Sequence, residues 1–187
     1  MRICLATKSP RRLELMKMIA ADFLTAAPEA DENFTKKRPH AVVRELAKKK
    51  ARAAKATIPS ISDTLIIAAD TIVFFESAIV GKPIDEADAF RMLKRLSGRQ
   101  HAVYTGVCFL KEGKERVFYD KSLVRMKKLS DGEIRHYIEE CRPLDKAGAY
   151  GVQDGGVVES YIGSYFNIMG FPVEKISKEL KIEGLDG

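Results

Sequence analysis

The segment that most constrains the fold of this chain is TLIIAADTIVFF, residues 64–75, which is almost entirely apolar and rich in β-branched side chains. This composition predicts a buried β-strand. The apolar run is too short to span a bilayer, and Asp70 interrupts it. A carboxylate inside an apolar strand is costly unless it is paired, hydrogen-bonded or bound to a metal. The segment therefore predicts both a central strand and a candidate functional residue.

Strand and helix patterns alternate on either side of this segment. RICLA at residues 2–6 predicts a short buried strand, and a helix is predicted from Ser9, a favourable N-cap, to about residue 20. A second helix is predicted at about 40–56, followed by a linker at 56–63. A strand that enters a helix through a short polar turn is typical of an α/β protein.

The second half of the chain continues the alternation. Asp85 and Gly98 are suited to begin and end a helix, and Ser130 and Glu133 have the spacing of a capping box. The elements expected are a helix over 85–97, a hairpin of strands at 101–110 and 116–126, a helix over 130–140, a glycine-rich loop at 142–156, strand material within 157–172, and a closing helix at 173–181. The fold class predicted is α/β, a mixed β-sheet flanked by helices. The 187 residues suit one domain over 1–187, or two small lobes that share a core.

The charge of the chain points to an anionic partner. The net charge is +6, which suits either a nucleic-acid surface or a pocket for a phosphorylated small molecule. The densest basic segment, AKKKARAAKA at 47–56, also has helical composition and is equally compatible with a solvated helix face. Three cysteines without CxxC spacing and an N-terminus without signal-peptide features predict a cytoplasmic protein with reduced thiols.

The motif SPRR, residues 9–12, is the first candidate anion site. The first turn of a helix exposes unpaired amide hydrogens, and Arg11 and Arg12 add guanidinium groups that match phosphate oxygens. Lys8 lies in the preceding turn. The alternative is that both arginines lie in solvent, but cations at a helix N-terminus oppose the helix dipole. The motif predicts an anion without identifying it.

Asp70 is the second candidate. At the point where a strand gives way to a loop, its carboxylate would face the crevice in which α/β proteins bind ligands, and would ligate a divalent cation or deprotonate a water. The alternative is a structural aspartate that caps a turn. The hydroxyl of Thr71 would read a base or sugar edge, although a β-branched residue also fits a strand on propensity alone.

Weaker signals lie in the loops. Lys82, in a turn between glycine and proline, is a candidate phosphate ligand, and Gln153 offers a donor and an acceptor to a base edge. Asp145 and Lys146 form either an internal ion pair or part of the site. The acidic pair at 31–32 would ligate a metal only if its loop folds towards Asp70, and otherwise is a solvated loop.

Several other chemistries are excluded by the absence of their motifs. The sequence contains no GxxxxGK[ST] loop, no GxSxG elbow, no HExxH and no paired CxxC. The histidines at 40, 101 and 136 are scattered, so no zinc site is predicted.

Taken in order, these segments resemble the Maf family of nucleoside triphosphate pyrophosphatases. The resemblance rests on LATKSPRRLELM, VVRELAKKKARA, AADTIVFF, VGKPIDEADAFRMLKRLSGR, HAVYTGV, PLDKAGAYGVQ and GSYFNIMGFP, which together cover nearly the whole chain. It implies an elongated, strongly curved sheet with two lobes around a central cleft, similar to the inosine-triphosphate pyrophosphatases. It also implies a cytoplasmic enzyme of nucleotide house-cleaning that depends on a divalent cation, Mg²⁺ or Mn²⁺. A homodimer is an expectation by resemblance only.

The resemblance also implies roles for individual residues. The aspartate of the ADT block, Asp70, corresponds to the proposed general base, and Arg11, Thr71 and Gln153 correspond to positions tied to substrate choice. Their combination resembles the branch that prefers dTTP and UTP, with modified pyrimidine nucleotides as further candidates, over the branch that acts on 7-methyl-GTP. The phosphate and metal positions correspond to Ser9, Arg12, Glu32, Lys50 and Lys82, with Glu32 and Asp70 as the metal ligands.

Two residues depart from the family pattern. Lys8 stands where the family usually has a smaller residue, and it either adds a phosphate contact or narrows the entrance. Asp154 follows Gln153 where the family usually has glycine, which bears on base preference more than on the reaction.

Two rival functions remain from other classes. A nucleic-acid-binding domain would use the basic helix at 44–55, and it predicts a steep salt dependence of binding without a role for Asp70. A nucleotide-sensing regulator of cell division, suggested by the link between this family and septum formation, predicts nucleotide binding with negligible turnover. The enzyme is expected to act on a nucleoside triphosphate and to bind neither nucleic acid nor membrane.

Overall fold

A computed structural model describes residues 2–27, 29–58 and 63–182 of the chain. The elements are β1 (Arg2–Ala6), α1 (Pro10–Met16), β2 (Leu24–Ala26), α2 (Pro39–Thr57), β3 (Thr64–Phe75), β4 (Ala78–Val80), α3 (Glu86–Leu96), β5 (Gln100–Lys111), β6 (Lys114–Met126), α4 (Asp131–Cys141), β7 (Val158–Ile162), α5 (Tyr165–Met169) and α6 (Val173–Ile182). Three short 3₁₀ turns, η1 (Pro143–Asp145), η2 (Ala147–Ala149) and η3 (Val152–Asp154), lie between α4 and β7. None of the described helices is both long and apolar enough to cross a membrane.

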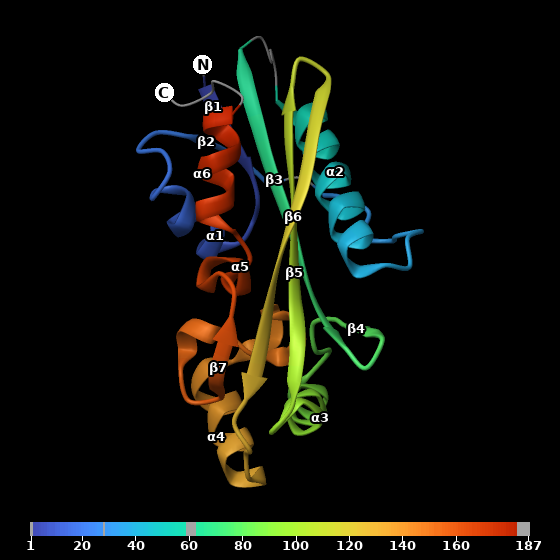
Figure 1. Cartoon of the computed structure of the whole chain (residues 1–187), viewed down its shortest axis with the longest axis vertical. Helices are drawn as coiled ribbons and strands as arrows, with labels where there is room; N and C mark the ends of the chain where they lie inside the picture. Colours follow the sequence, from blue (N-terminus) through green and yellow to red (C-terminus); the bar gives the residue numbers. More distant parts are fainter. Residues whose placement is uncertain (1, 28, 59–62, 183–187) are drawn as a thin grey trace.

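One mixed sheet runs through the molecule, as predicted. Its strand order is β2-β1-β3-β5-β6-β7, and the short β4 pairs with β3. β1 is parallel to β2 and β3, whereas the pairs formed by β3, β5, β6 and β7 are antiparallel. The long strands β3, β5 and β6 twist strongly and extend from one end of the elongated molecule to the other (Figure 1).

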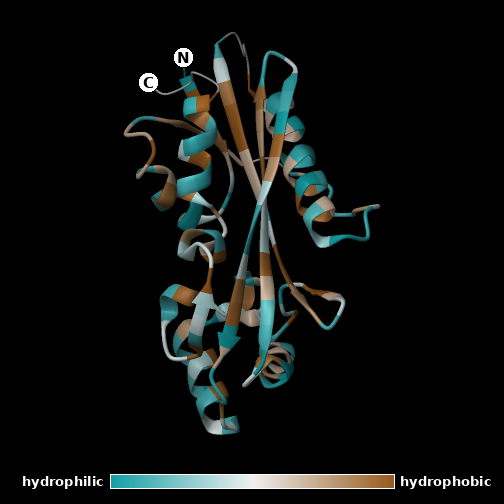
Figure 2. Ribbon diagram, viewed as in Figure 1, coloured by the Kyte–Doolittle hydropathy of each residue, from teal (hydrophilic) through white to brown (hydrophobic). Residues whose placement is uncertain are grey.

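Hydrophobic side chains form cores at both ends of the sheet. At one end α2 covers one face, and α1, α5 and α6 cover the other (Figure 1). The core between the sheet and the helices α1 and α6 is formed by residues such as Leu5, Ile67 and Ile176. At the other end α3, α4 and η2 pack against the sheet around Leu93 and Ile134. In Figure 2 hydrophobic residues follow β3, whereas hydrophilic residues are prominent on α2 and α6. The two cores correspond to the two lobes that the resemblance implied.

The close approach of α2 to the sheet depends on a glycine of β5. A Cβ built on Gly106 would lie 2.3 Å from the carbonyl oxygen of Val43 and 2.8 Å from the amide nitrogen of Arg44. Real Cβ atoms are not found so close to backbone, so only glycine fits at this position. Gly106 therefore sets the depth at which α2, which carries Lys50, lies on the sheet.

The predicted helix signals are confirmed in the second half of the chain. Asp85 accepts a hydrogen bond from the amide of Asp88 at the start of α3, and Ser130 and Glu133 form a complete capping box at the start of α4. Gly98 follows α3 with a φ of +69°, a conformation that favours glycine. The predicted hairpin is also present, since β5 and β6 pair along their whole length.

Two expectations need correction, and a third falls partly outside the described residues. The helix that begins after Ser9 ends at Met16, and turns with i→i+3 hydrogen bonds follow it to Ile19. The segment 157–172 contains one strand, β7, and the helix α5 follows it. This helix is capped by Ser164 and ends at Gly170, which has a φ of +101°. Residues 59–62 of the predicted linker lie outside the described residues, and α2 extends to Thr57.

Candidate active site

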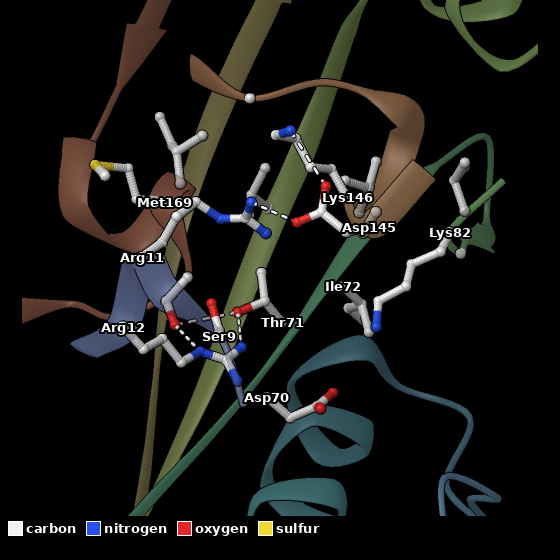
Figure 3. Close-up of a pocket in the computed structure, with 18 of the residues that line it drawn as sticks. Ser9, Arg11, Arg12, Asp70, Thr71, Ile72, Lys82, Asp145, Lys146 and Met169 are labelled. Atoms are coloured by element: carbon white, nitrogen blue, oxygen red, sulfur yellow. Dashed lines mark hydrogen bonds and ion pairs between the residues drawn. The ribbon is translucent and has the colours of Figure 1, made fainter. Parts of the chain in front are cut away.

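A pocket of about 330 Å³ lies between the two ends of the sheet (Figure 3). Its walls come from α1, α2, β3, β4, the η turns and the segment at the end of α5. Every site residue expected from the sequence lines it: Ser9, Arg11, Arg12, Glu32, Lys50, Asp70, Thr71, Lys82 and Gln153. The described fold therefore brings together residues that are spread over more than 140 positions of the sequence.

Asp70 lies in the middle of β3, and not at the end of a strand as expected from the sequence. On one edge β3 pairs with β1 up to Ala68 and with β4 from Val73, so residues 69–72 have no partner among the described strands on that edge. On its other edge Asp70 pairs with Gly106 of β5. The gap left by the end of β1 gives a central strand the access to ligand that a strand end normally has. The crevice was therefore predicted correctly, but the way in which it is opened was not.

Asp70 is bound to a cation that comes from the helix above it. Its side chain is 11% exposed and forms a hydrogen-bonded ion pair with the ammonium of Lys50, whose side chain is 19% exposed. The same ammonium lies 3.4 Å from Glu32 Oε1. One positive charge thus holds two carboxylates that are 38 positions apart in the sequence, Glu32 in the loop before α2 and Asp70 in β3.

The acidic pair predicted at 31–32 is divided between two environments. Glu32 lines the pocket, whereas Asp31 pairs with Lys49 at 2.7 Å and does not line it. No group of three or more His, Cys, Asp or Glu side chains placed to hold a metal occurs among residues 2–27, 29–58 and 63–182. Within the described chain, Glu32 and Asp70 are the two pocket carboxylates that share one cation, the ammonium of Lys50.

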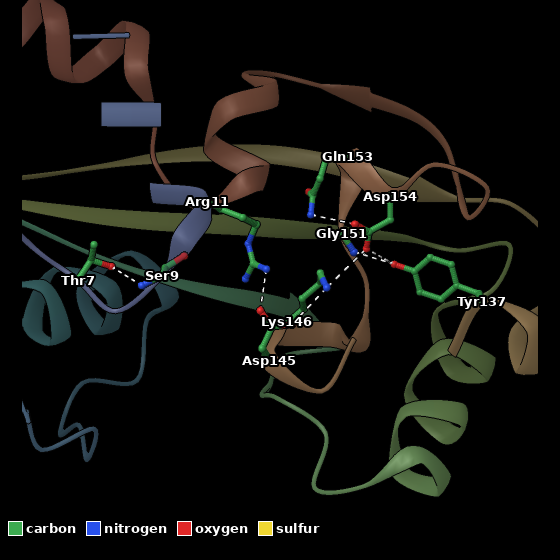
Figure 4. A network of polar contacts seen from close by, with 9 residues as sticks. All are labelled: Thr7, Ser9, Arg11, Tyr137, Asp145, Lys146, Gly151, Gln153 and Asp154. Carbon is green, nitrogen blue, oxygen red and sulfur yellow. Dashed lines mark hydrogen bonds and ion pairs between the residues drawn. The ribbon is translucent and has the colours of Figure 1, made fainter. Parts of the chain in front are cut away.

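Arg11 spans the pocket from α1 to the η1 turn. Its Nη1 donates to Asp145 Oδ2 at 2.7 Å, and Lys146 lies 3.2 Å from the other oxygen of the same carboxylate (Figures 3 and 4). Burial raises the pKa of Asp145, but the hydrogen bond and charge of Arg11 outweigh it, so the pKa lies below its usual value. The sequence left open whether Asp145 and Lys146 form an ion pair or belong to the site, and both are true.

Arg12 has a different environment from its neighbour. Its Nε donates to the carbonyl oxygen of Gly170 at 2.8 Å, its Nη1 to that of Ala69 at 2.8 Å, and its Nη2 to Thr71 Oγ1 at 3.1 Å. A guanidinium has five N–H donors, so two remain for a ligand. Arg12 therefore ties α1 to β3 and to the end of α5, and the backbone of Ala69 that it binds belongs to the unpaired edge of β3.

The hydroxyl of Thr71 is also occupied by protein. Besides Arg12, it contacts Thr105 Oγ1 at 3.0 Å, and Thr105 in turn donates to the carbonyl oxygen of Asn167 at 3.0 Å. Thr71 thus donates to Thr105 and accepts from Arg12. This geometry favours a role in shaping the pocket wall over direct reading of a base by the hydroxyl, which the sequence had offered as one alternative.

Gln153 lies in a network that the sequence analysis did not detect. Its Nε2 donates to Asp154 Oδ1 at 3.1 Å, and Asp154 Oδ2 accepts a hydrogen bond of 2.7 Å from Tyr137 Oη (Figure 4). Tyr137 belongs to α4, where its apolar spacing is that of any core residue. Burial, and secondarily the hydrogen bond to Asp154, raise the pKa of Tyr137, so its hydroxyl stays protonated.

The remaining cations lie at the rim of the pocket. Lys82, in the turn after β4, is exposed and has no carboxylate partner within the described chain, and Figure 3 shows its side chain extending on the side of β3 to which Asp70 points. Ser9 makes no capping bond with its side chain, although its amide donates to Thr7 Oγ1 at 3.0 Å. Lys8 pairs with the exposed Glu29 and does not line this pocket, so its effect on phosphate binding or on the entrance stays a prediction.

The basic segment of α2 is largely neutralised by acidic partners. Lys48 and Arg52 pair with Glu115, and Lys49 pairs with Asp31. Lys50 points into the pocket. These contacts weaken the case for a nucleic-acid surface on this helix, since the charges that would bind phosphate already have partners.

The comparisons with known proteins agree with this arrangement. A family model described as Maf-like protein matches residues 2–183. A protein of Thermosipho melanesiensis named dTTP/UTP pyrophosphatase is 44% identical over 178 residues, which cover 94% of both chains. Proteins with the same name from Agathobacter rectalis and Carboxydothermus hydrogenoformans are 42% and 43% identical, over 99% and 97% of this chain and 98% of theirs. On the match of the family model over nearly its whole length, the chain belongs to the Maf-like protein family.

Proposed function

We propose that this protein is a nucleoside triphosphate pyrophosphatase that hydrolyses dTTP and UTP to the monophosphate and pyrophosphate. The proposal is supported by relatives of that name that align over nearly the whole chain. It is also supported by the pocket, in which cationic side chains surround a shielded carboxylate next to a region with apolar walls. A pocket of this size and mixed character is typical of a small-molecule site.

The triphosphate is held by the cations on both sides of β3. Lys82 and Lys50 lie on the side of Asp70, and Arg11 approaches from α1. Arg11 is paired with Asp145, and the phosphate oxygens of a bound substrate would replace that carboxylate as its partner. Ser9 adds a hydroxyl next to these groups, and Arg12 contributes its two remaining donors.

The chemistry of the donors fits a hard divalent cation. Asp70 and Glu32 already share one positive charge in the form of the Lys50 ammonium, so their oxygens face a common position. Mg²⁺ is usually held by one or two carboxylates together with substrate phosphates, and Mn²⁺ accepts the same ligands. When bound there, the metal would neutralise phosphate charge and polarise a water.

Asp70 prepares the attacking water. Its carboxylate accepts a proton from a water that lies in line with the α-phosphorus. The new P–O bond forms as the bond to the bridging oxygen breaks, and that oxygen leaves with its electron pair as part of pyrophosphate. Arg11 and Lys82 stabilise the charge on the leaving group. Asp70 would then serve as both base and metal ligand, and the alternative is that a bound metal would activate the water instead.

The nucleobase of the substrate lies at the end of the pocket formed by α5 and the η turns. Val73, Val103, Ile168 and Met169 supply apolar groups to the lining, and Gln153 supplies a polar group to it. Thr71 and Arg11 influence substrate choice through the shape and charge of this region. The sequence analysis did not identify the apolar lining, because valines in strands are indistinguishable from core residues in a sequence.

The observation that carries the proposal is the Lys50–Asp70–Glu32 cluster at the unpaired edge of β3. The test incubates the purified protein with Mg²⁺ or Mn²⁺ and a panel of nucleoside triphosphates, and separates the products by ion-exchange chromatography. We expect dTMP and UMP in equal amounts with pyrophosphate. Formation of nucleoside diphosphate and phosphate would refute the reaction, and binding of nucleotide without turnover would favour the regulatory alternative.

A further inference from the structure

The side-chain amide of Gln153 is held in one orientation by its neighbour. Its nitrogen donates to Asp154 Oδ1 at 3.1 Å, and its oxygen is turned away from the carboxylate (Figure 4). A carboxylate accepts hydrogen bonds and does not donate them, so the reverse orientation of the amide would place two acceptors together. One of the two amide hydrogens is therefore used by protein and fixes which way the amide faces, so the amide oxygen is presented on the side away from Asp154.

Asp154 is itself fixed from several sides. Tyr137 Oη donates to its Oδ2 at 2.7 Å, and Lys146 Nζ lies 3.7 Å from the same oxygen. The hydroxyl of Tyr137 also accepts the amide hydrogen of Gly151 at 2.9 Å. The side chain of Asp154 is only 15% exposed, and α4 anchors Tyr137, which is 6% exposed. Gln153 itself is exposed, but the carboxylate that orients its amide is held in place by protein.

Gly151 provides the space that this arrangement needs. A Cβ built on Gly151 would lie 2.4 Å from Gln153 Nε2 and 2.7 Å from Asp154 Oδ2. Both side chains are therefore folded over the backbone of Gly151, and any larger residue would displace them.

We propose that Asp154 is a positioning residue that makes the site select uracil and thymine over cytosine, by presenting the oxygen of Gln153 to the base. The inference rests on the proposed function for the presence of a pyrimidine nucleotide in the pocket. Uracil and thymine carry a hydrogen on N3, which donates to an amide oxygen. Cytosine has a lone pair at N3, which a fixed oxygen repels. A Gln153 free to rotate would offer either group and would accept all three bases.

The test compares kcat/KM for UTP and CTP among four proteins: the wild type, Asp154→Ala, Gln153→Ala and the double variant. We expect Asp154→Ala to lower the preference for UTP over CTP by about tenfold, the size of one mismatched hydrogen bond. In the Gln153→Ala background the same substitution should leave the ratio unchanged. An unchanged ratio in Asp154→Ala, or an equal fall in both backgrounds, would overturn the proposal, since Asp154 would then act on the loop in general.

Two further variants separate orientation from charge and from loss of folding. Glu159→Ala removes a carboxylate of the same charge from the exposed strand β7, where Glu159 pairs with Arg125 of β6. This variant should leave the ratio at the wild-type value. Gly151→Ala retains the Asp154 carboxylate in the sequence but displaces both side chains, so it should lower the ratio as Asp154→Ala does. A ratio that falls in Glu159→Ala as well would attribute the effect to net charge and overturn the proposal.

A binding measurement distinguishes failure of this inference from failure of the proposed function. Titration of the wild type and Asp154→Ala with UMP and CMP, followed by NMR, requires no turnover. If the wild type hydrolyses no nucleotide, the proposed function fails, and preferential binding of UMP that is lost in Asp154→Ala would still support the role of Asp154. Equal binding of UMP and CMP by the wild type would overturn the inference whether or not UTP is hydrolysed.

Discussion

Lys50 and Asp70 form an ion pair between the middle of α2 and the middle of β3, with both side chains largely shielded from solvent. The pair exists because α2 lies unusually close to the sheet and because β1 ends two residues before Asp70 in register. The cost of burying the carboxylate is offset by its ion pair, at a position that lines the pocket. The relationship thus connects the packing of a helix to the chemistry proposed for the pocket.

The adjacent arginines should separate in their effects. Arg12→Lys should lower the free energy of unfolding by about 2–4 kcal/mol, because an ammonium cannot replace three directed guanidinium bonds to Gly170, Ala69 and Thr71. Arg11→Lys should lower it by less than about 1 kcal/mol, because its ion pair with Asp145 is partly exposed. Urea denaturation of both variants measures the two values.

In enzyme kinetics we expect the larger effect from the Arg11 variant, which has the smaller effect on stability. Arg11→Lys should raise KM for dTTP and UTP, since the guanidinium fork matches phosphate oxygens and an ammonium does not. Equal losses of stability in the two variants would contradict the assignment of Arg12 as the structural member of the pair.

Gly106→Ala tests the close approach of α2. The added methyl group would meet the backbone of Val43, so we expect a loss of at least about 2 kcal/mol in stability, and a fall in kcat as Lys50 moves away from Asp70. Gly132→Ala in α4 is the matched control, because a Cβ there has no neighbour within 4 Å. Thermal unfolding of both variants checks the prediction, and two equal melting temperatures would count against it.

His101 should make stability depend on pH in the acidic range. It is 3% exposed, its Nε2 lies 2.6 Å from Tyr150 Oη, and its Nδ1 has no partner within the described chain. Burial lowers the pKa of His101 to about 4 from 6.5. The unfolded chain therefore takes up a proton near pH 6.5 that the folded protein resists, so stability falls as the pH drops towards 4.

The expected loss of unfolding free energy from His101 is roughly 3 kcal/mol between pH 7 and pH 4. Because carboxylates also titrate in this range, the quantity to measure is the difference in unfolding free energy between the wild type and His101→Gln at each pH. A difference that does not vary with pH would show that burial does not lower the pKa of His101 in the folded protein.

The sequence predicted the α/β class, the order of the long elements and the capping residues of α3 and α4. These depend on local spacing, on side chains such as Asp85 and Ser130, and on apolar patterns within a single segment. The end of α1 and the helix α5 were not predicted correctly, because short helices depend on contacts more than on propensity.

The residues named from the sequence and by resemblance line one pocket, but their separate environments were not predicted. Arg11 and Arg12 are equivalent in the sequence, and the partners that distinguish them, Asp145 and Gly170, lie 134 and 158 positions away. The orientation of Gln153 depends on Tyr137, which packs from another helix. Long-range packing of this kind leaves no local trace in a sequence. The homodimer remains a prediction.

The most direct test of the account measures pyrophosphate release from dTTP and UTP by the wild type and by Asp70→Asn, with Mg²⁺ present. Asparagine keeps the shape of the side chain and an acceptor for Lys50 but cannot take a proton, so kcat should fall by about 10²–10⁴. Glu140→Gln, which removes an exposed carboxylate of α4, is the control and should retain full activity. Unchanged turnover in a folded Asp70→Asn protein would contradict the central claim that this carboxylate prepares the water.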